Sequence, residues 1–281
     1  MSVQAMAIHA AGEKLPTGLI MMARFGLPLF LNLTFAFLFK KVRKELRFHN
    51  VKLLTFRSIS AAIAMSLVFL AIPGNNAGIV YLVFFSQPIF IPFLLRIWLK
   101  IPLHAPLFVG IILSIVGLSL VLKPGEDAVS WTLFLVPIAT LAASFSSVSL
   151  RQLHYSDTTL AITTFYCGIG TCLGAILALF DSATTLSPLT AQAIAALFVI
   201  GITGFIFQFL ITEGMKYGPS RLLSPFLYAS SLFSLFLDYL FFAESVTLIN
   251  LLGVALVIGG VVLNIFLFPK DKITKIGSVN E

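Results

Sequence analysis

Charged residues are scarce in this sequence. Only 10% of its 281 residues are Asp, Glu, Lys or Arg, whereas 59% are hydrophobic, and the mean hydropathy is +1.04. No polar stretch is long enough to form a soluble domain between the hydrophobic ones. This shortage of charge excludes a water-soluble globular protein and indicates a chain that folds in a lipid bilayer.

The motifs of metal, cofactor and catalytic sites are missing as well. The two cysteines and four histidines form no HExxH and no paired Cys/His motif. The glycines of "CGIGTCLGAI" (167–176) have the wrong spacing for a dinucleotide-binding loop, and Gly170 and Gly174 instead form a GxxxG pair, which predicts close helix packing. We therefore expect no catalytic residues, no metal and no cofactor, and an intramembrane enzyme is the least supported function.

Long hydrophobic runs, by contrast, fill the chain. A helix needs about 20 apolar residues to cross the hydrocarbon core of a membrane. Nine stretches meet this requirement: 16–39, 53–73, 77–98, 103–122, 129–150, 158–180, 190–213, 219–242 and 247–268. The sequence predicts an all-α polytopic membrane protein with nine transmembrane helices.

The few charges are distributed unevenly. Lys and Arg (18) outnumber Asp and Glu (11), and most of the basic residues fall in alternate connections, above all in 40–52 and 270–275. Membrane proteins concentrate Lys and Arg in cytoplasmic loops, so we expect the C-terminus in the cytoplasm. The natural partners of these loops are anionic lipid headgroups, and the net charge of +7 does not indicate nucleic acid.

A diverged internal repeat runs through the sequence. At an offset of 143 residues Gly110 aligns with Gly253, Gly117 aligns with Gly260, and the predicted helix ends coincide. The charge bias gives the aligned helices opposite directions, which is the inverted repeat of many secondary transporters. The repeats and the tail that follows them occupy 1–124, 125–269 and 270–281.

The two repeats differ in length, with four predicted spans in the first and five in the second. Residues 1–7 align with 144–150, the last turns of the first helix of the second repeat. We expect either that the protein has lost the corresponding first helix or that its true start lies further upstream.

Three motifs resemble the EamA-like transporters of the drug/metabolite transporter superfamily. "MARF" at Arg24 is similar to an arginine motif early in the family's second helix, and "QPIF" (87–90) to the Pro-x-Phe of its fourth. The segment 240–263 is similar to the family's closing signature, an acidic residue before a Gly-containing last helix. The resemblance covers residues 8–268 and implies two inverted EamA-like repeats of five helices each.

That resemblance also implies a function. Members of the EamA-like family carry small metabolites, such as amino acids or related amphipathic compounds, across the cytoplasmic (inner) membrane, most often outward. The sequence departs from the family at Lys100-Ile101, where an acidic residue is usual, and at Ser231, where proline is usual. Because the counterpart of the first helix is missing as well, a non-transporting or degenerate membrane subunit is the alternative.

Charged residues within the predicted spans are the main site candidates. Such a residue costs about 2.5–3.5 kcal/mol at mid-bilayer, so it usually faces the protein interior or a wet cavity. Arg24 lies eight residues and Asp238 four residues from the outer ends of their spans. We predict that they pair or face one outward-facing vestibule, unless they only lock helices or Arg24 reaches the headgroups. Arg57 lies near the inner interface, where we expect it to extend toward the headgroups.

Polar residues on neighbouring spans complete the candidate set. Tyr228, Ser231 and Asp238 share one helical face, and Tyr81 aligns with Ser224 of the same stripe in the second repeat. Pro88 lacks an N–H and leaves a carbonyl free, which a bilayer tolerates beside a cavity or a polar neighbour. The candidate substrate-binding residues are Arg24, Tyr81, Gln87, Pro88, Gln208, Tyr228, Ser231 and Asp238. The sequence thus predicts a carrier that works by alternating access around a central cavity shared by both repeats.

Overall fold

The structure, a computed structural model, consists of helices in every part that it describes. These parts are residues 3, 4, 7, 16–73, 75, 77–99, 107–122, 130–180, 190–217, 240 and 248–267. The helices are α2 (Thr17–Leu38), α3 (Lys40–Glu45), α4 (Val51–Ala71), α5 (Ala77–Phe85), α6 (Gln87–Leu99), α7 (Leu107–Leu122), η1 (Trp131–Phe134), α8 (Leu135–Leu153), α9 (Thr159–Phe180), α10 (Ala191–Tyr217) and α12 (Leu248–Leu267). The prediction of an all-α chain is confirmed.

Among the described residues, five helical segments are long and apolar enough to cross a membrane: Thr17–Leu38, Val51–Ala71, Trp131–Leu150, Thr159–Phe180 and Ala191–Lys216. Three shorter apolar segments, Ile79–Ile91, Phe108–Gly117 and Leu251–Gly260, fall within further predicted spans. The predicted span 219–242 lies outside the described residues except for residue 240, so the total of nine stays a prediction. The chain is a multi-pass membrane protein.

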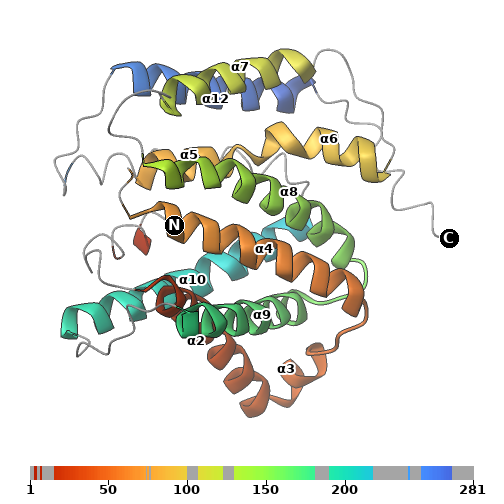
Figure 1. Cartoon of the computed structure of the whole chain (residues 1–281). Helices are drawn as coiled ribbons and strands as arrows, with labels where there is room; N and C mark the ends of the chain where they lie inside the picture. The colour runs from red at the N-terminus through yellow and green to blue at the C-terminus, as the bar shows by residue number, and fades with distance from the viewer. Residues whose placement is uncertain are drawn as a thin grey trace.

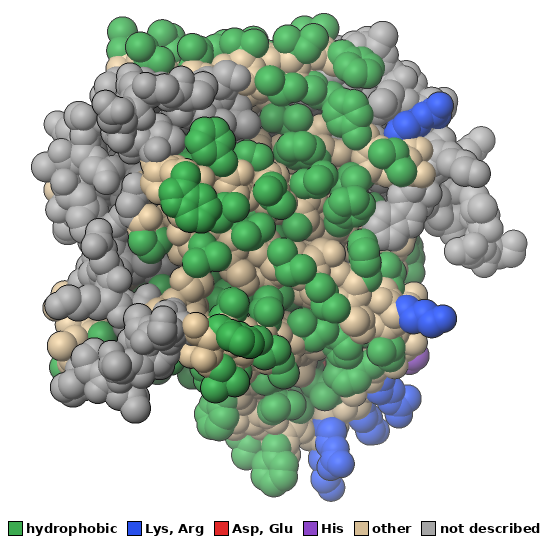
Figure 2. All heavy atoms as spheres, viewed as in Figure 1, with side chains coloured by type: hydrophobic (Ala, Val, Ile, Leu, Met, Phe, Trp, Pro, Cys, Tyr) green, Lys and Arg blue, Asp and Glu red, His purple; other side chains and the backbone are tan. Residues whose placement is uncertain are grey.

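The distribution of side chains is inverted relative to a water-soluble protein. Phe37 at the end of α2 is 87% exposed and Leu179 at the end of α9 is 85% exposed, whereas the hydroxyls of Thr140, Ser144 and Thr163 are buried. Each of these hydroxyls donates to the carbonyl four residues earlier in its own helix, at 2.7–2.8 Å. Figure 2 shows a broad hydrophobic face, with the visible Lys and Arg side chains toward the right-hand end of the view. Lipid is the solvent that suits such a surface.

Glycines allow α2 to pack closely on α9. A Cβ on Gly170 would lie 2.5 Å from the Phe25 ring, and a Cβ on Gly174 would lie 2.9 Å from the Cβ of Met21. Both distances are shorter than any real Cβ contact, so only glycine fits at these two positions. The predicted packing role of this GxxxG pair is confirmed.

A second glycine seam joins α7 to α12, which lie side by side at the edge of the molecule (Figure 1). A Cβ on Gly117 would lie 2.6 Å from the carbonyl oxygen of Gly253, and a Cβ on Gly260 would collide with the carbonyl oxygen of Gly110. Between them, the Ser114 hydroxyl donates at 3.4 Å to the carbonyl of the residue 143 positions later. The two helices therefore meet through aligned positions of the two sequence repeats.

The predicted span 77–98 is broken into α5 and α6 at Ser86. The proline at position 88 has no N–H, and it lies in the first turn of α6, where that loss is tolerated. Polar groups surround the break: the Thr140 hydroxyl of α8 donates to the Val83 carbonyl at 2.9 Å, and the Ser86 hydroxyl donates to it as well, at 2.5 Å. The break is thus satisfied from a neighbouring helix, as an irregular backbone in a membrane requires.

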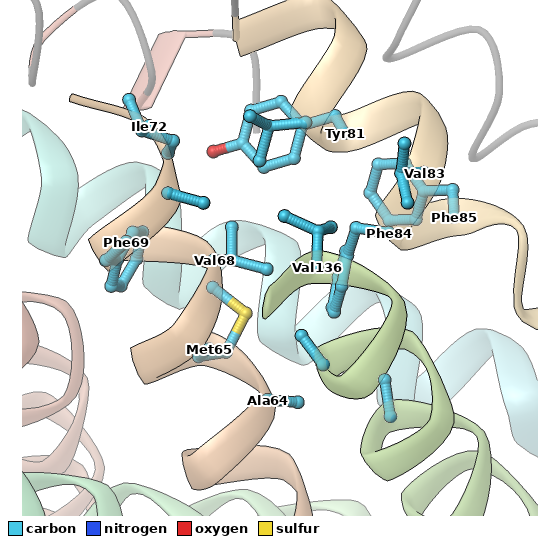
Figure 3. Close-up of a cluster of buried hydrophobic side chains, with 14 of the residues drawn as sticks. Ala64, Met65, Val68, Phe69, Ile72, Tyr81, Val83, Phe84, Phe85 and Val136 are labelled. Atoms are coloured by element: carbon cyan, nitrogen blue, oxygen red, sulfur yellow. The ribbon is translucent and has the colours of Figure 1, made fainter. Parts of the chain in front are cut away.

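A hydrophobic cluster fills the space between α4, α5 and α8 (Figure 3). Val68 of α4 and Val136 of α8 are fully buried, and the Tyr81 ring stacks on the Phe85 ring at a centroid distance of 6.0 Å. In Figure 3 the phenol oxygen of Tyr81 points toward α4, on the side of Ile72. This cluster holds the broken helix against α4 and α8.

The turn between α8 and α9 is tied to the segment before α4. The fully buried Asp157 carboxylate accepts hydrogen bonds from the backbone N–H groups of His49 (2.7 Å) and Asn50 (3.2 Å) and from the Ser156 hydroxyl (2.6 Å). The Asn50 side chain in turn accepts from the Leu53 N–H and caps the start of α4. The Asp157 carboxylate therefore holds the turn after α8 against the segment before α4.

Residues near the N-terminus pack against α10. Gln4 is fully buried and its Nε2 donates to the Ile200 carbonyl at 3.0 Å. Under the offset of 143, Gln4 aligns with Ser147 of α8, and Ile200 aligns with Arg57 of α4, the helix against which α8 packs. Under this offset, the contact of Gln4 with α10 corresponds to the packing of α8 on α4.

Candidate functional site

A cavity of about 90 Å³ lies in the middle of the helix bundle. One water needs about 10–15 Å³ of such space, so the cavity has room for several waters or a small ligand group. The described residues that line it come from α2, α4, α5, α6, α8, α9 and α10: Arg24, Arg57, Ala61, Ala64, Met65, Phe84, Phe85, Gln87, Ala143, Ser146, Ser147, Leu150, Tyr166, Phe207, Gln208, Ile211 and Met215. Both halves of the chain contribute to its wall.

Arg24 of α2 is fully buried at the edge of this cavity. A Cβ on Gly204 of α10 would lie 2.6 Å from the Cδ and the Nη1 of Arg24, so the guanidinium passes directly over the backbone of α10. Within the described chain, the Nε and Nη1 of Arg24 have no hydrogen-bond partner. An unpaired buried charge of this kind is costly, which makes Arg24 a candidate for binding a ligand.

Arg57 of α4 is the second arginine in the wall, and its side chain was expected to extend to the headgroups. That expectation is wrong, because Arg57 is only 3% exposed and lines the cavity. Its Cζ lies 4.3 Å from the centroid of the Tyr166 ring, a cation–π contact that covers one face of the guanidinium. Among the described residues, nothing accepts a hydrogen bond from its Nε or Nη1.

Amide and hydroxyl groups make up the rest of the polar lining. The Ser147 hydroxyl donates to Oε1 of Gln87 at 2.8 Å, and Nε2 of Gln208 donates to the Thr212 hydroxyl at 3.0 Å. Gln87 thereby keeps its amide N–H groups for other partners, and Gln208 keeps its carbonyl oxygen. The lining offers donors and acceptors that are already held in place.

The described part of the cavity wall is positively charged. It contains two arginines and, within the described part of the chain, neither aspartate nor glutamate. Tyr166 and the amides and hydroxyls beside them are neutral. The same part of the chain contains no group of three or more His, Cys, Asp or Glu that is suited to hold a metal ion.

Comparison with known families identifies the second half of the chain. Residues 130–266 match the model of the EamA-like transporter family. The second half of this chain belongs to the EamA-like transporters. It supplies α8, α9, α10 and α12, so the EamA-like half contributes Ser146, Ser147, Tyr166, Phe207 and Gln208 to the cavity.

The fold is that of at least one solved protein. A structure titled only "Crystal structure of protein" aligns with a TM-score of 0.71 over 95% of this chain and 93% of its own, at 19% sequence identity. At this identity the match shows a shared fold. No curated protein matches the chain.

The structure brings together some of the residues that the sequence singled out. Arg24, Gln87 and Gln208 line the same cavity. Tyr81 lies instead in the hydrophobic cluster between α4, α5 and α8, and it is not among the described lining residues. The backbone at Pro88 belongs to the first turn of α6, next to Gln87.

The remaining candidates, Tyr228, Ser231 and Asp238, lie outside the described residues. The predicted pairing of Arg24 with Asp238 therefore stays a prediction, as does the role of each candidate in binding.

Sequence reasoning did not select Arg57 or Tyr166 for the site. Arg57 carried a usable signal, since it lies six residues inside α4, a membrane-spanning helix. Tyr166 carried none, because an aromatic residue in a hydrophobic span looks the same whether it faces lipid, core or cavity.

Proposed function

We propose that this protein is a secondary carrier that exports small metabolites, such as amino acids or related amphipathic compounds, by alternating access. The observation that carries the proposal is the polar cavity inside a bundle of membrane-spanning helices, with Arg24, Gln87 and Gln208 in its wall. A transporter needs a site of this kind between its two halves. Membership of the second half in a transporter family supports the same conclusion.

An inverted repeat is part of this proposal. Gly117 contacts Gly253, and Gly110 contacts Gly260. Since Gly110 aligns with Gly253 and Gly117 aligns with Gly260, the two contacts are equivalent under the offset of 143. A pseudo-two-fold axis between the halves would produce such a pair of equivalent contacts. They support two EamA-like repeats, 1–124 and 125–269, that rock against each other around the cavity.

The proposed orientation places the basic end of the molecule in the cytoplasm. The Lys and Arg side chains visible in Figure 2 gather toward that end, and α3 contains four of them in six residues. We place the protein in the cytoplasmic membrane. By the positive-inside rule the tail 270–281 then lies inside, with anionic headgroups against the loop 40–52.

The candidate residues have separate roles in this mechanism. Arg24, Gln87 and Gln208 bind substrate in the cavity, and the break beside Pro88 supplies a point where the helix bends. Tyr228, Ser231 and Asp238 form the polar stripe of the second half, with Tyr81 as the counterpart of that stripe in the first. Asp238 is the candidate for proton coupling.

A transport assay on reconstituted protein tests the proposal. Proteoliposomes are loaded with a metabolite extract, and the efflux of each compound is measured with and without a pH gradient. Wild type should release a subset of compounds, and Arg24→Gln and Asp238→Asn should slow that release. The matched control is Phe30→Leu, at a 64% exposed position of α2.

Unchanged efflux in both polar variants would remove Arg24 and Asp238 from the mechanism. If no compound leaves the proteoliposomes faster than it leaves loaded liposomes without protein, with or without the pH gradient, a non-transporting membrane subunit is favoured instead.

A further inference from the structure

We propose that the central cavity is an anion site: Arg24 and Arg57 together bind the oxyanion of a small amphipathic compound that carries net negative charge. The oxyanion is a carboxylate or a phosphate. The inference deepens the proposed function and rests on it for transport, because it names the class of substrate that the same cavity accepts.

The unpaired nitrogens of the two arginines are the first observation. Nε and Nη1 of both residues are buried and, among the described residues, find no acceptor. Each buried donor left unpaired costs about 1–3 kcal/mol, and more when it is charged. These four atoms belong to two side chains that line one cavity, so an acceptor that enters the cavity can supply the missing partners.

The charge balance of the wall is the second observation. Two guanidinium groups share the cavity, and no carboxylate from the described residues neutralises them. Both remain protonated at every physiological pH, because arginine is effectively never deprotonated in proteins. Their mutual repulsion and their loss of hydration favour the entry of an anion over that of a neutral or cationic compound.

The guanidinium groups are also held in position. Gly204 lets Arg24 lie against the backbone of α10, and the Tyr166 ring covers a face of Arg57 at 4.3 Å. A guanidinium stacked on a ring still presents its N–H edge, and this planar edge matches the two oxygens of a carboxylate or phosphate. The Tyr166 ring packs edge-on against Phe25 at 5.0 Å, so the positioning extends back to α2.

Apolar side chains in the same wall select an apolar body. Met65, Phe84, Phe85 and Phe207 line the cavity together with the arginines. A ligand that fits both kinds of lining carries an oxyanion and an aliphatic or aromatic group. The ammonium of a zwitterionic amino acid would meet no carboxylate among the described lining residues, so the site favours the anion over the zwitterion of the same shape.

Four phenyl compounds that differ in charge test the proposal. They are 3-phenylpropionate (carboxylate), phenyl phosphate, phenylalanine (zwitterion) and phenethylamine (cation). Each is titrated against the full-length protein in nanodiscs, and the thermal midpoint of unfolding is recorded. A ligand that binds only the folded state raises this midpoint with concentration. We expect a rise with 3-phenylpropionate or phenyl phosphate, the larger rise identifying the oxyanion, and none with phenethylamine.

Variants of the arginines separate binding from folding. Arg57→Gln and Arg24→Gln should each weaken anion binding at least tenfold, the equivalent of about 1.4 kcal/mol, and Arg57→Lys should weaken it less because the charge remains. The matched control is Ile59→Val, at a 45% exposed position of α4. If Arg57→Gln does not yield a monodisperse protein, Arg57→Lys compared with Ile59→Val keeps the test decisive.

Three results would overturn the proposal: neither anion shifts the midpoint, phenylalanine or phenethylamine shifts it as much as the anions do, or the arginine variants bind the anions as wild type does. Transport of phenylalanine without anion binding would leave the carrier function intact and reject the anion site. Anion binding without transport in proteoliposomes would reject the carrier function and keep the site.

Discussion

Gly204 and Gly168 are glycines of neighbouring helices with opposite surroundings. A Cβ on Gly204 would lie 2.6 Å from the Nη1 of Arg24, whereas a Cβ on Gly168 would meet nothing within 4 Å. Only the first glycine is required by a close approach. The Arg24 guanidinium can therefore lie where it does because Gly204 of α10 has no side chain.

Substituting the two glycines gives effects of opposite sign. Gly204→Ala forces Arg24 or α10 to move, and we expect it to lower the free energy of unfolding by about 1–3 kcal/mol and to impair anion binding. Gly168→Ala, the matched control, should raise stability by up to about 1 kcal/mol because alanine favours the helix. Chemical denaturation of both variants measures this, and a stable, fully binding Gly204→Ala would contradict the placement of Arg24.

His154 gives the protein a pH-dependent stability outside the membrane-spanning segments. It caps the end of α8, and its Nε2 donates to the Thr212 carbonyl at 2.9 Å. Burial lowers its pKa below the ordinary value of 6.5, an effect opposed by the bond to Thr212 and the Glu213 carboxylate and assisted by Lys216 and Arg57. The folded protein thus prefers the neutral ring.

The direction of the effect follows from this lowered pKa. As the pH falls below about 6.5, the unfolded chain takes up a proton that the folded state resists, so stability falls until the folded pKa is passed. In His154→Gln the amide can donate to the same carbonyl without titrating. We expect thermal midpoints of wild type to drop more than those of the variant between pH 7 and pH 5. Parallel curves for the two proteins would contradict this account.

At the scale of the element, the break between α5 and α6 shows what a hydropathy pattern omits. The sequence predicts a single span over 77–98, and it marks Pro88 as the point of a lost hydrogen bond. It does not show that Thr140, on a helix more than 50 residues later, donates to the Val83 carbonyl. The break depends on its neighbour because a bilayer supplies no water for the free carbonyls.

Thr140→Val removes this support and keeps the shape of the side chain. Hydrogen bonds between membrane helices contribute about 0.6 kcal/mol on average and at most about 1.7 kcal/mol, so we expect a loss of stability in that range. Thr203→Val is the control, since the Thr203 hydroxyl bonds to carbonyls of its own helix. The free energies of unfolding of both variants are measured in mixed detergent micelles. If Thr140→Val loses no more stability than Thr203→Val, the hydrogen bond to Val83 contributes nothing.

At the scale of the whole molecule, the seam between α7 and α12 connects the two sequence repeats. Contacts at Gly117 and at Gly260 are equivalent under the offset of 143 residues, and each brings a glycine against a backbone carbonyl of the other helix. Such close approach lets helix pairs in membranes gain van der Waals packing.

Valine at either position should open this seam. We expect Gly117→Val and Gly260→Val to lower stability by similar amounts, about 1–3 kcal/mol each, and the double variant to lose less than the sum because one seam is opened only once. Gly259→Ala is the control, because its Cβ would meet only a Leu113 methyl at 3.9 Å. Strongly unequal single effects, measured by thermal unfolding in nanodiscs, would argue against equivalent contacts.

The candidate site was predictable only in part. Arg24 could be selected from the sequence because a lone charge in a long apolar run has few acceptable places. Gln87 and Gln208 followed from similar reasoning about polar groups. Tyr81 shows the limit of this reasoning: its polar atom suggested a cavity position, yet its ring packs in the hydrophobic cluster.

The sequence by itself determined that the chain crosses a membrane as a series of helices. Length and hydrophobicity of each run suffice for this, because a bilayer requires every backbone group to be bonded within the segment. The packing of the helices brings Arg57 to the same cavity as Arg24. The inward face of a helix depends on how it rotates and packs against others, and here that packing depends on glycines and hydroxyls distant in the sequence. The hydropathy of a span does not specify how its helix is rotated.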